Sequence, residues 1–227
     1  MGYTRRILDT ELDELFGVLA ALAIDGAKGV GKTTTAEQRV ADVVRLDSRA
    51  SREAIEAEPE QLLTHPRPLL LDEWQKVPAV WDVVRRSVDR DRSGGQFLLA
   101  GSATPVAGAT AHSGAGRIGR LRMRPMTLSE RGVAEPTVSL RELLSGSRGS
   151  LAGSTRLRLS DYVEEIVASG FPGMRDLPAR ALRFQLDSYL HNAVDRDVPD
   201  QGLAVRRPEA MLAWLRAYAA ASATTAS

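Results

Sequence analysis

A glycine-rich segment that ends in lysine and threonine carries the clearest chemistry in the sequence. Residues 26–33 read GAKGVGKT, which has the spacing G-x-x-x-x-G-K-[ST] of a phosphate-binding loop. The apolar residues 20–24 predict a strand before the segment and the following residues predict a helix, which is the context that this motif requires. Glycine lets the backbone turn so that its N–H groups and the start of the next helix can surround phosphate oxygens. A glycine-rich surface turn is the plainer alternative.

The positions of this motif have distinct expected roles around a magnesium nucleotide. The Lys32 ammonium would reach the β- and γ-phosphates, and the Thr33 hydroxyl would coordinate Mg2+. Mg2+ keeps several waters and usually shares phosphate oxygens with one or two protein oxygens. The loop alone does not separate ATP from GTP, but the sequence has no N-K-x-D segment for guanine. We therefore expect ATP and Mg2+ as cofactors, with the nucleotide bound by Gly26, Ala27, Lys28, Gly29, Val30, Gly31, Lys32, Thr33 and Thr34.

Two acids about forty residues further on supply the second half of the expected site. The three leucines 69–71 read as a strand buried on both faces, and Asp72 and Glu73 end it on the side where open α/β sheets bind ligands. We expect Asp72 to hold Mg2+ and Glu73 to polarise the attacking water. A pair of solvated acids at the start of a loop is the alternative, and the upstream lysine loop argues against it.

A further apolar strand, residues 96–101, ends in the polar segment Ser102-Ala103-Thr104. If this strand lies between the loop strand and the acid strand, a hydroxyl at its end reaches the γ-phosphate and the water. Ser102 and Thr104 are therefore candidate sensors, with Ser102 the stronger. Serine and threonine are also common wherever strands end, and the two interpretations carry equal weight.

Arginines follow a stretch rich in glycine, alanine and serine at 106–119, which we expect to form a mobile loop. In residues 120–124 strict alternation places Leu121 and Met123 on one strand face and three arginines on the other. A charged edge strand is the plainer interpretation. The sharper one is that Arg117 or Arg120 contacts the γ-phosphate, in its own subunit or a neighbour, as an arginine finger. A third possibility is that these arginines contact the phosphates of a nucleic acid, but the segment lacks the aromatic residues that would stack bases.

The composition is that of a soluble globular protein. The 227 residues are 43% hydrophobic and 26% charged, with a net charge of +1 that gives no overall field for nucleic acid. The absence of cysteine excludes disulfides, thiolate zinc sites and cysteine nucleophiles, and three isolated histidines have no metal-ligand spacing. No apolar run is long enough to cross a bilayer, and acids interrupt any signal-peptide pattern near the N-terminus. We expect a cytoplasmic protein without a membrane partner.

The order of these segments predicts an α/β fold of the P-loop NTPase class. A mostly parallel five-stranded sheet is expected, with strands at 20–24, 43–46, 69–73, 96–101 and 120–124 and helices at 9–17, 34–40, from Ser48 to Pro59 and at 77–88. The serine- and glycine-rich stretch predicts a linker at 145–159 between an ATP-binding domain, residues 1–144, and a helical region, residues 160–227. Ser160 would cap its first helix. The last helix has neither cap nor stop, which suggests a lid or the start of a domain that continues in a longer protein.

With these residues in view, the chain resembles the prokaryotic AAA-type ATPases that carry an uncharacterised C-terminal domain. The matching blocks are GAKGVGKTTTA at 26–36, LLLDEWQKVPAVWD at 69–82, FLLAGSATP at 97–105, HSGAGRIGRLRMRPMTLSE at 112–130 and SGFPG at 169–173. The resemblance implies an AAA-like core with Lys32, Thr33, Asp72 and Glu73 in their usual roles and a polar sensor in the GSATP segment. It also implies that the C-terminal domain is truncated here.

Three classes of function fit these residues to different degrees. The ordered loop, acid pair and sensor segment favour an ATPase that couples hydrolysis to a conformational change. A small-molecule kinase would need an acceptor pocket, and residues 106–116 show no such constellation. The alternative outside enzymes is a nucleotide-gated module that barely hydrolyses ATP and holds a protein or DNA partner through the arginine strand and the C-terminal helices. Assembly into a homo-oligomer would favour the arginine finger.

Overall fold

A five-stranded parallel sheet forms the centre of the protein. The computed structural model describes residues 2–101, 114–146, 151, 153–200, 202–222 and 224. The sheet has the order β2-β3-β4-β1-β5, and every neighbouring pair is parallel. The strands are β1 Ala21–Asp25, β2 Asp42–Arg45, β3 Leu69–Asp72, β4 Phe97–Gly101 and β5 Ile118–Arg122. The predicted fold class, with five parallel strands flanked by helices, is confirmed.

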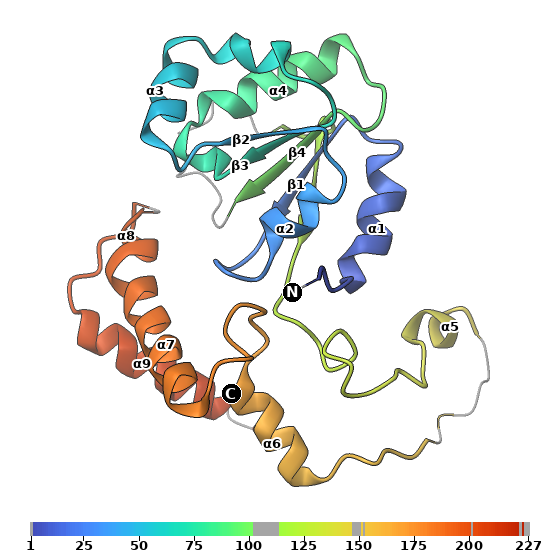
Figure 1. The fold of residues 1–227 in the computed structure, drawn as a ribbon, viewed down its shortest axis with the longest axis vertical. Coiled ribbons are helices and arrows are strands. Elements are labelled where there is room, and N and C mark those ends of the chain that lie inside the picture. The colour runs from blue at the N-terminus through green and yellow to red at the C-terminus, as the bar shows by residue number, and fades with distance from the viewer. Residues whose placement is uncertain are drawn as a thin grey trace.

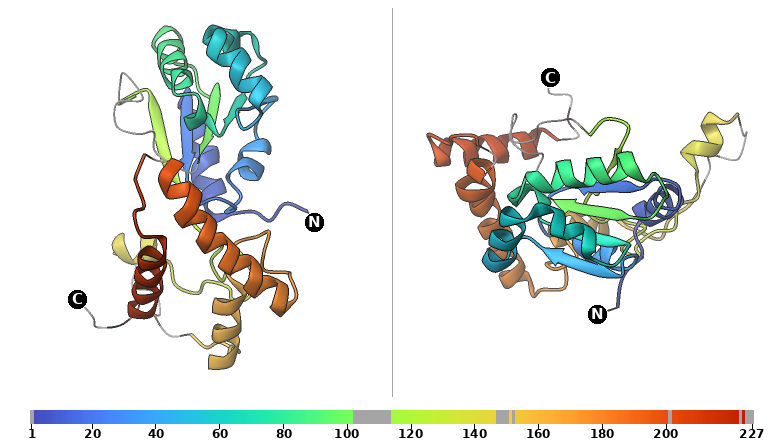
Figure 2. Two further views of the ribbon diagram at one scale, coloured as in Figure 1. Left: turned by 90° about the vertical axis from the view of Figure 1, so that its left-hand side faces the viewer. Right: turned by 90° about the horizontal axis from the view of Figure 1, so that it is seen from above.

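Helices cover both faces of the sheet, because the apolar side chains of each strand alternate between two cores. Leu69 and Leu71 of β3 face the core that α4 covers, whereas Leu70 faces the opposite core with Leu12 of α1. Figure 2 shows the sheet between these two helical layers. One layer holds α1 Ile7–Phe16 and α2 Lys32–Glu37, and the other holds α3 Arg49–Ala57, the 3-10 helix η1 Pro59–Thr64 and α4 Ala79–Arg90.

The structure shifts several predicted boundaries. The last strand begins at Ile118 and not at 120, since its first residue pairs with Ala21 of β1. Leu121 and Met123 are both buried, as the alternation predicted, and β5 is an edge strand. The helix after the glycine-rich segment ends at Glu37, three residues earlier than expected. Ser48 does stand at the N-cap position of α3, although its side chain makes no capping hydrogen bond there.

The C-terminal part of the chain is helical, as expected, and lies beyond the carboxyl ends of the central strands (Figure 1). One of its two longest helices, α7, continues directly into a π-helical turn. Ser160 lies inside the first turn of α6 and is not its cap, because the helix already begins at Leu159. The elements are α5 Leu140–Leu144, α6 Leu159–Ala168, α7 Ala179–Asn192, the π-helical turn η3 Ala193–Asp197, α8 Val198–Asp200 and α9 Pro208–Ala221.

Contacts join this helical region to the core at the glycine-rich segment. The ring of Phe171 packs against the core and against Tyr189, with ring centroids 4.9 Å apart. Many apolar side chains of α6, α7 and α9 remain exposed, among them Ile166, Phe184 and Trp214. A domain boundary at 145–159 stays a prediction. In the described part of the chain no helix is both long and apolar enough to cross a bilayer.

Candidate functional site

The glycine-rich segment forms a turn between the end of β1 and the start of α2, where the motif predicted it. Gly29 and Gly31 have φ angles of 77° and 103°, in the left-handed region that favours glycine. At Gly26 the constraint is space, because a Cβ atom there would lie 2.3 Å from the carbonyl oxygen of Met123. The sequence folds this way because only glycine permits both the reversed φ values and the close approach of β5.

Lys32 is the first residue of α2 and lies under the turn with its side chain buried. Its ammonium donates hydrogen bonds of 2.9 Å each to the carbonyl oxygens of Gly26 and Ala27. Burial lowers the pKa of Lys32, and the carboxylates of Glu73 and Asp72 oppose that shift. The cation thus stands among acids at the carboxyl ends of β1 and β3.

Asp72 ends β3 and points its carboxylate at the start of α2. The Thr33 hydroxyl donates a hydrogen bond of 2.9 Å to Asp72 Oδ1, so the loop and the acid strand meet as the sequence predicted. Burial raises the pKa of Asp72, the nearby Glu73 adds to the shift, and the hydrogen bond from Thr33 opposes it. A carboxylate and a hydroxyl therefore present adjacent oxygens at one point, which is a donor set that suits a hard cation.

Replacing Asp72 with asparagine is expected to stabilise the protein at neutral pH. A carboxyl group whose pKa is raised on folding supports the folded state fully below its unfolded pKa of about 4, and this contribution is lost as pH rises through the raised value. The Asp72→Asn protein should therefore unfold at a higher urea concentration than wild type at pH 7, with the difference shrinking towards pH 4. Asp42→Asn is the control with the opposite sign, because hydrogen bonds from His65 and the Val43 N–H lower the pKa of Asp42. It should unfold at a lower urea concentration than wild type at pH 7. Lower stability of Asp72→Asn at pH 7 would contradict the expectation.

Glu73 follows in the left-handed conformation, with φ 53° and ψ 38°, which is unusual for a residue other than glycine. The Gln75 amide Nε2 donates a hydrogen bond of 2.6 Å to Glu73 Oε2 and holds the carboxylate. Glu73 lines a cavity of about 460 Å3 together with Ala27 and Lys28 of the loop. The left-handed turn and Gln75 thus hold the Glu73 carboxylate at the cavity beside the loop.

The far wall of this first cavity comes from the helical region. Tyr189 of α7 and Asp197 of η3 line it, and both also bind the loop. The Tyr189 hydroxyl donates a hydrogen bond of 3.2 Å to the Lys28 carbonyl oxygen, and the Lys28 ammonium forms an ion pair with Asp197. These contacts join residues more than 150 positions apart, and no local pattern predicts them.

A second cavity, of about 680 Å3, opens on the other side of α2. It is lined by Gly31, Thr34, Thr35 and Gln38 from the loop and its helix and by Tyr3 from the N-terminal segment. The SGFPG turn closes it through Pro172 and Gly173. The two cavities therefore flank the phosphate loop, one beside the acids and one beside Thr34.

The structure separates the two arginines that were finger candidates. Arg117 directly precedes β5 and so lies at the amino ends of the parallel strands, whereas the loop lies at their carboxyl ends. Its Nε donates a hydrogen bond of 2.8 Å to Asp89 Oδ1. It does not share the site with Lys32 in one chain, and a role towards a neighbour stays a prediction. Arg120 lies nearer, with its Nη1 3.8 Å from Asp25 Oδ2 and its guanidinium over the Trp81 ring.

Ser102 and Thr104 lie outside the described residues, so their sensor role stays a prediction. The strand before them does lie between β1 and β3, and its last residue, Gly101, pairs with Asp25. Asp25 is an acid that the sequence reasoning passed over, although its position directly before the glycine motif was the available signal. Burial raises its pKa, whereas Arg120 and Arg122 oppose that shift.

Comparison with known proteins agrees with this geometry. A family model described as an AAA domain matches residues 20–131. Domain III of the replication initiation protein DnaA from Thermotoga maritima is similar at 16% sequence identity and a TM-score of 0.36, over 90% of this chain and 87% of that chain, a level that supports no inference about function. No curated protein matches the sequence. The matched segment contains all five strands, the loop and both acids, and residues 20–131 are thus an AAA domain of the P-loop ATPase type.

Proposed function

We propose that the protein binds Mg-ATP at the loop, hydrolyses it, and couples hydrolysis to a movement of its helical region. The AAA domain itself indicates a nucleotide-binding function of the ATPase type. The observation that carries the finer proposal is the meeting of Lys32, Thr33 and Asp72 at one end of the sheet, with Thr33 Oγ1 2.9 Å from Asp72 Oδ1. Separate strands deliver a phosphate-binding cation and a metal-binding oxygen pair to one point.

The residues present fit a magnesium ion. Thr33 and Asp72 would hold it, since a buried carboxylate with a raised pKa gains when a cation takes the place of its proton. A bound Mg2+ would neutralise the negative charge that develops on the phosphate oxygens during transfer. Lys32 contributes a second positive charge on the loop side of the same phosphates, in place of its bonds to Gly26 and Ala27.

Glu73 is the residue that we assign to the attacking water. Its carboxylate faces the first cavity beside Ala27 and Lys28, where Gln75 fixes one of its oxygens. The other oxygen can accept a hydrogen bond from water and orient it towards the terminal phosphate. A rigid, oriented carboxylate needs no rearrangement at the moment of reaction, which is the condition for effective positioning.

The second cavity suits the nucleoside part of ATP. A triphosphate held by the loop has its terminal phosphate near Glu73, so the ribose and base extend to the opposite side of the loop. That side is the cavity lined by Gly31, Thr34 and Gln38, with Tyr3 on its wall. At about 680 Å3 it lies within the range of about 300–1,000 Å3 typical of small-molecule pockets.

The helical region is placed to respond to the loop. Lys28 is bound by Tyr189 and Asp197 from that region, and the Lys28 side chain sits beside the phosphate position. A change in charge at the terminal phosphate therefore acts directly on a contact that holds the two parts together. This supports a coupling between hydrolysis and movement of α7 and η3.

Calorimetry and phosphate release on the purified protein test the proposal. Mg-ATP should bind with measurable heat, ATP should bind more weakly in the presence of a chelator, and inorganic phosphate should accumulate with turnover. Mg-GTP is the comparison ligand. Absence of binding heat in folded protein would overturn the proposal, whereas binding without phosphate release would favour the nucleotide-gated module. The exposed stacked rings of Trp214 and Tyr218 on α9 offer such a module a surface for a partner.

A further inference from the structure

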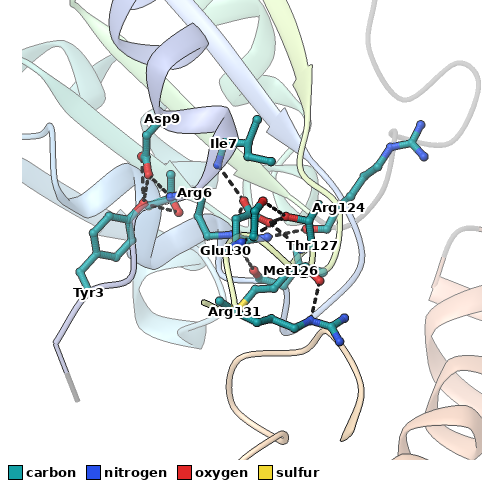
Figure 3. A network of polar contacts seen from close by, with 12 residues as sticks. Tyr3, Arg6, Ile7, Asp9, Arg124, Met126, Thr127, Glu130 and Arg131 are labelled. Atoms are coloured by element: carbon teal, nitrogen blue, oxygen red, sulfur yellow. Dashed lines mark hydrogen bonds and ion pairs between the residues drawn. The ribbon is translucent and has the colours of Figure 1, made fainter. Parts of the chain in front are cut away.

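Arg6 is a buried arginine that the proposed reaction does not use directly. It precedes α1 in the N-terminal segment, and only 6% of its surface is exposed. Its guanidinium donates three hydrogen bonds: Nη1 to the Val30 carbonyl at 2.7 Å, Nη2 to the Arg124 carbonyl at 2.7 Å, and Nε to Glu130 Oε1 at 3.0 Å. Figure 3 shows Arg6 between Glu130 and the backbone of the segment that follows β5.

The bond to Val30 reaches the middle of the phosphate loop. Val30 stands between Gly29 and Gly31, whose left-handed φ angles give the loop its shape. In a trans peptide the C=O and the following N–H point in opposite directions. By holding the Val30 carbonyl on its own side, Arg6 turns the Gly31 N–H away from itself, towards the inner side of the loop. Gly31 on one side of this peptide has no Cβ and restricts its rotation little, so an external anchor can decide its orientation.

The anchor is itself fixed in position. Glu130 accepts Arg6 Nε and the Ile7 N–H on one oxygen, and the Thr127 N–H and hydroxyl on the other. Burial raises the pKa of Glu130, but the hydrogen bonds from Thr127, Ile7 and Arg6 outweigh burial and hold the pKa below its usual value. The carboxylate is therefore ionised at neutral pH, and Arg6 is locked by a buried, fully hydrogen-bonded partner.

We propose that Arg6 is a positioning residue that presets the phosphate loop with the Gly31 N–H turned towards the phosphates. This rests on the proposed function, because it concerns how the same loop binds them. The N-terminal segment is thus part of the nucleotide site, although it is outside the motif. Arg6 and Glu130 also line the second cavity, so a probe without a nucleoside is needed to isolate their effect on the loop. Loss of the anchor leaves the loop free to adopt peptide orientations that do not bind anions.

The test measures phosphate binding apart from the nucleoside, with inorganic tripolyphosphate and ATP as probes, each with Mg2+. Arg6→Gln alone leaves Glu130 ionised and unpaired, so the informative protein is the double variant Arg6→Gln with Glu130→Gln. It should unfold near the wild-type temperature, yet bind both probes about tenfold more weakly, the equivalent of one oriented hydrogen bond in the loop. Arg6→Lys, which can keep one of the three contacts, should bind both probes with an affinity between those of wild type and the double variant.

Arg39→Gln is the matched control. Arg39 is also a largely buried arginine paired with acids, Asp9 and Asp13, but its backbone contacts are to Thr35 in α2 and Asp9 in α1 and not to the loop. It should lower thermal stability without changing tripolyphosphate affinity. Wild-type affinity in a folded double variant, or an equal loss of affinity in Arg39→Gln, would overturn the role proposed for Arg6 and leave the proposed function intact. Failure of wild type to bind either probe would instead overturn the proposed function and this inference with it.

Discussion

Mg-ATP binding is expected to fall by about 10- to 150-fold when Lys32 is replaced by alanine, because the phosphates lose a charge-assisted hydrogen bond worth about 1.5–3 kcal/mol. The Lys32 ammonium is buried beneath the loop, where it would exchange its 2.9 Å hydrogen bonds to the Gly26 and Ala27 carbonyls for bonds to the phosphates. Its charged neighbours include three acids, Asp72, Glu73 and Asp25, which would repel phosphate once this cation is gone.

Isothermal calorimetry with Mg-ATP measures this loss, and Lys76→Ala is the matched control. The chain has three lysines, at 28, 32 and 76. Lys76 belongs to the 3-10 helix η2 Trp74–Lys76 and lines the first cavity, but it is exposed and lies outside the loop. The control removes the same charge at the same end of the sheet and should change the affinity by less than about threefold, as expected for an exposed charge. Equal weakening in both variants would mean that overall charge, and not the loop lysine, binds the phosphates.

The parts of the site that could be predicted from sequence are those specified locally. The spacing of residues 26–33 fixes a turn, and the three leucines before Asp72 fix a strand whose carboxyl end must meet the loop in a parallel sheet. The boundary of β5 was harder to predict, because Gly119 stands directly before the alternation that begins at Arg120 and glycine is unfavourable inside a strand. Pairing with β1 extends the strand back to Ile118 in spite of that glycine.

The sequence alone could not predict the contacts between residues that are far apart along the chain. Arg6 and Glu130 are 124 positions apart, and Lys28 and Asp197 are 169 apart. An arginine near the N-terminus, here directly after Arg5, is expected to be a solvated charge, since arginine is mostly exposed. Only tertiary structure brings it against Val30. The left-handed conformation of Glu73 is likewise imposed by the chain around it, because glutamate has no preference for that region.

Hydrolysis is expected to fall by about 100- to 10,000-fold in Glu73→Gln, the range typical of losing a positioned acid or base, while Mg-ATP still binds. The amide keeps the size of the carboxylate and, like glutamate, is unfavourable at φ 53°, so the backbone strain is unchanged. It cannot accept a proton from water, however: its Oε1 can keep the hydrogen bond from Gln75, and its Nε2 then presents donors where the carboxylate accepted. The substitution thus removes the oriented base without removing any contact that we assign to ATP.

Single-turnover phosphate release beside calorimetry separates these two effects. Glu56→Gln is the matched control, because Glu56 on α3 lines the same cavity as Glu73 but has no assigned role in the reaction. It should keep wild-type turnover, which would show that losing one negative charge from the cavity is not the cause. Normal hydrolysis in Glu73→Gln would transfer the water-orienting role to another group. Asp25 would be the first alternative, since it stands directly before the loop at the end of β1 with a pKa raised by burial, in position to accept a proton.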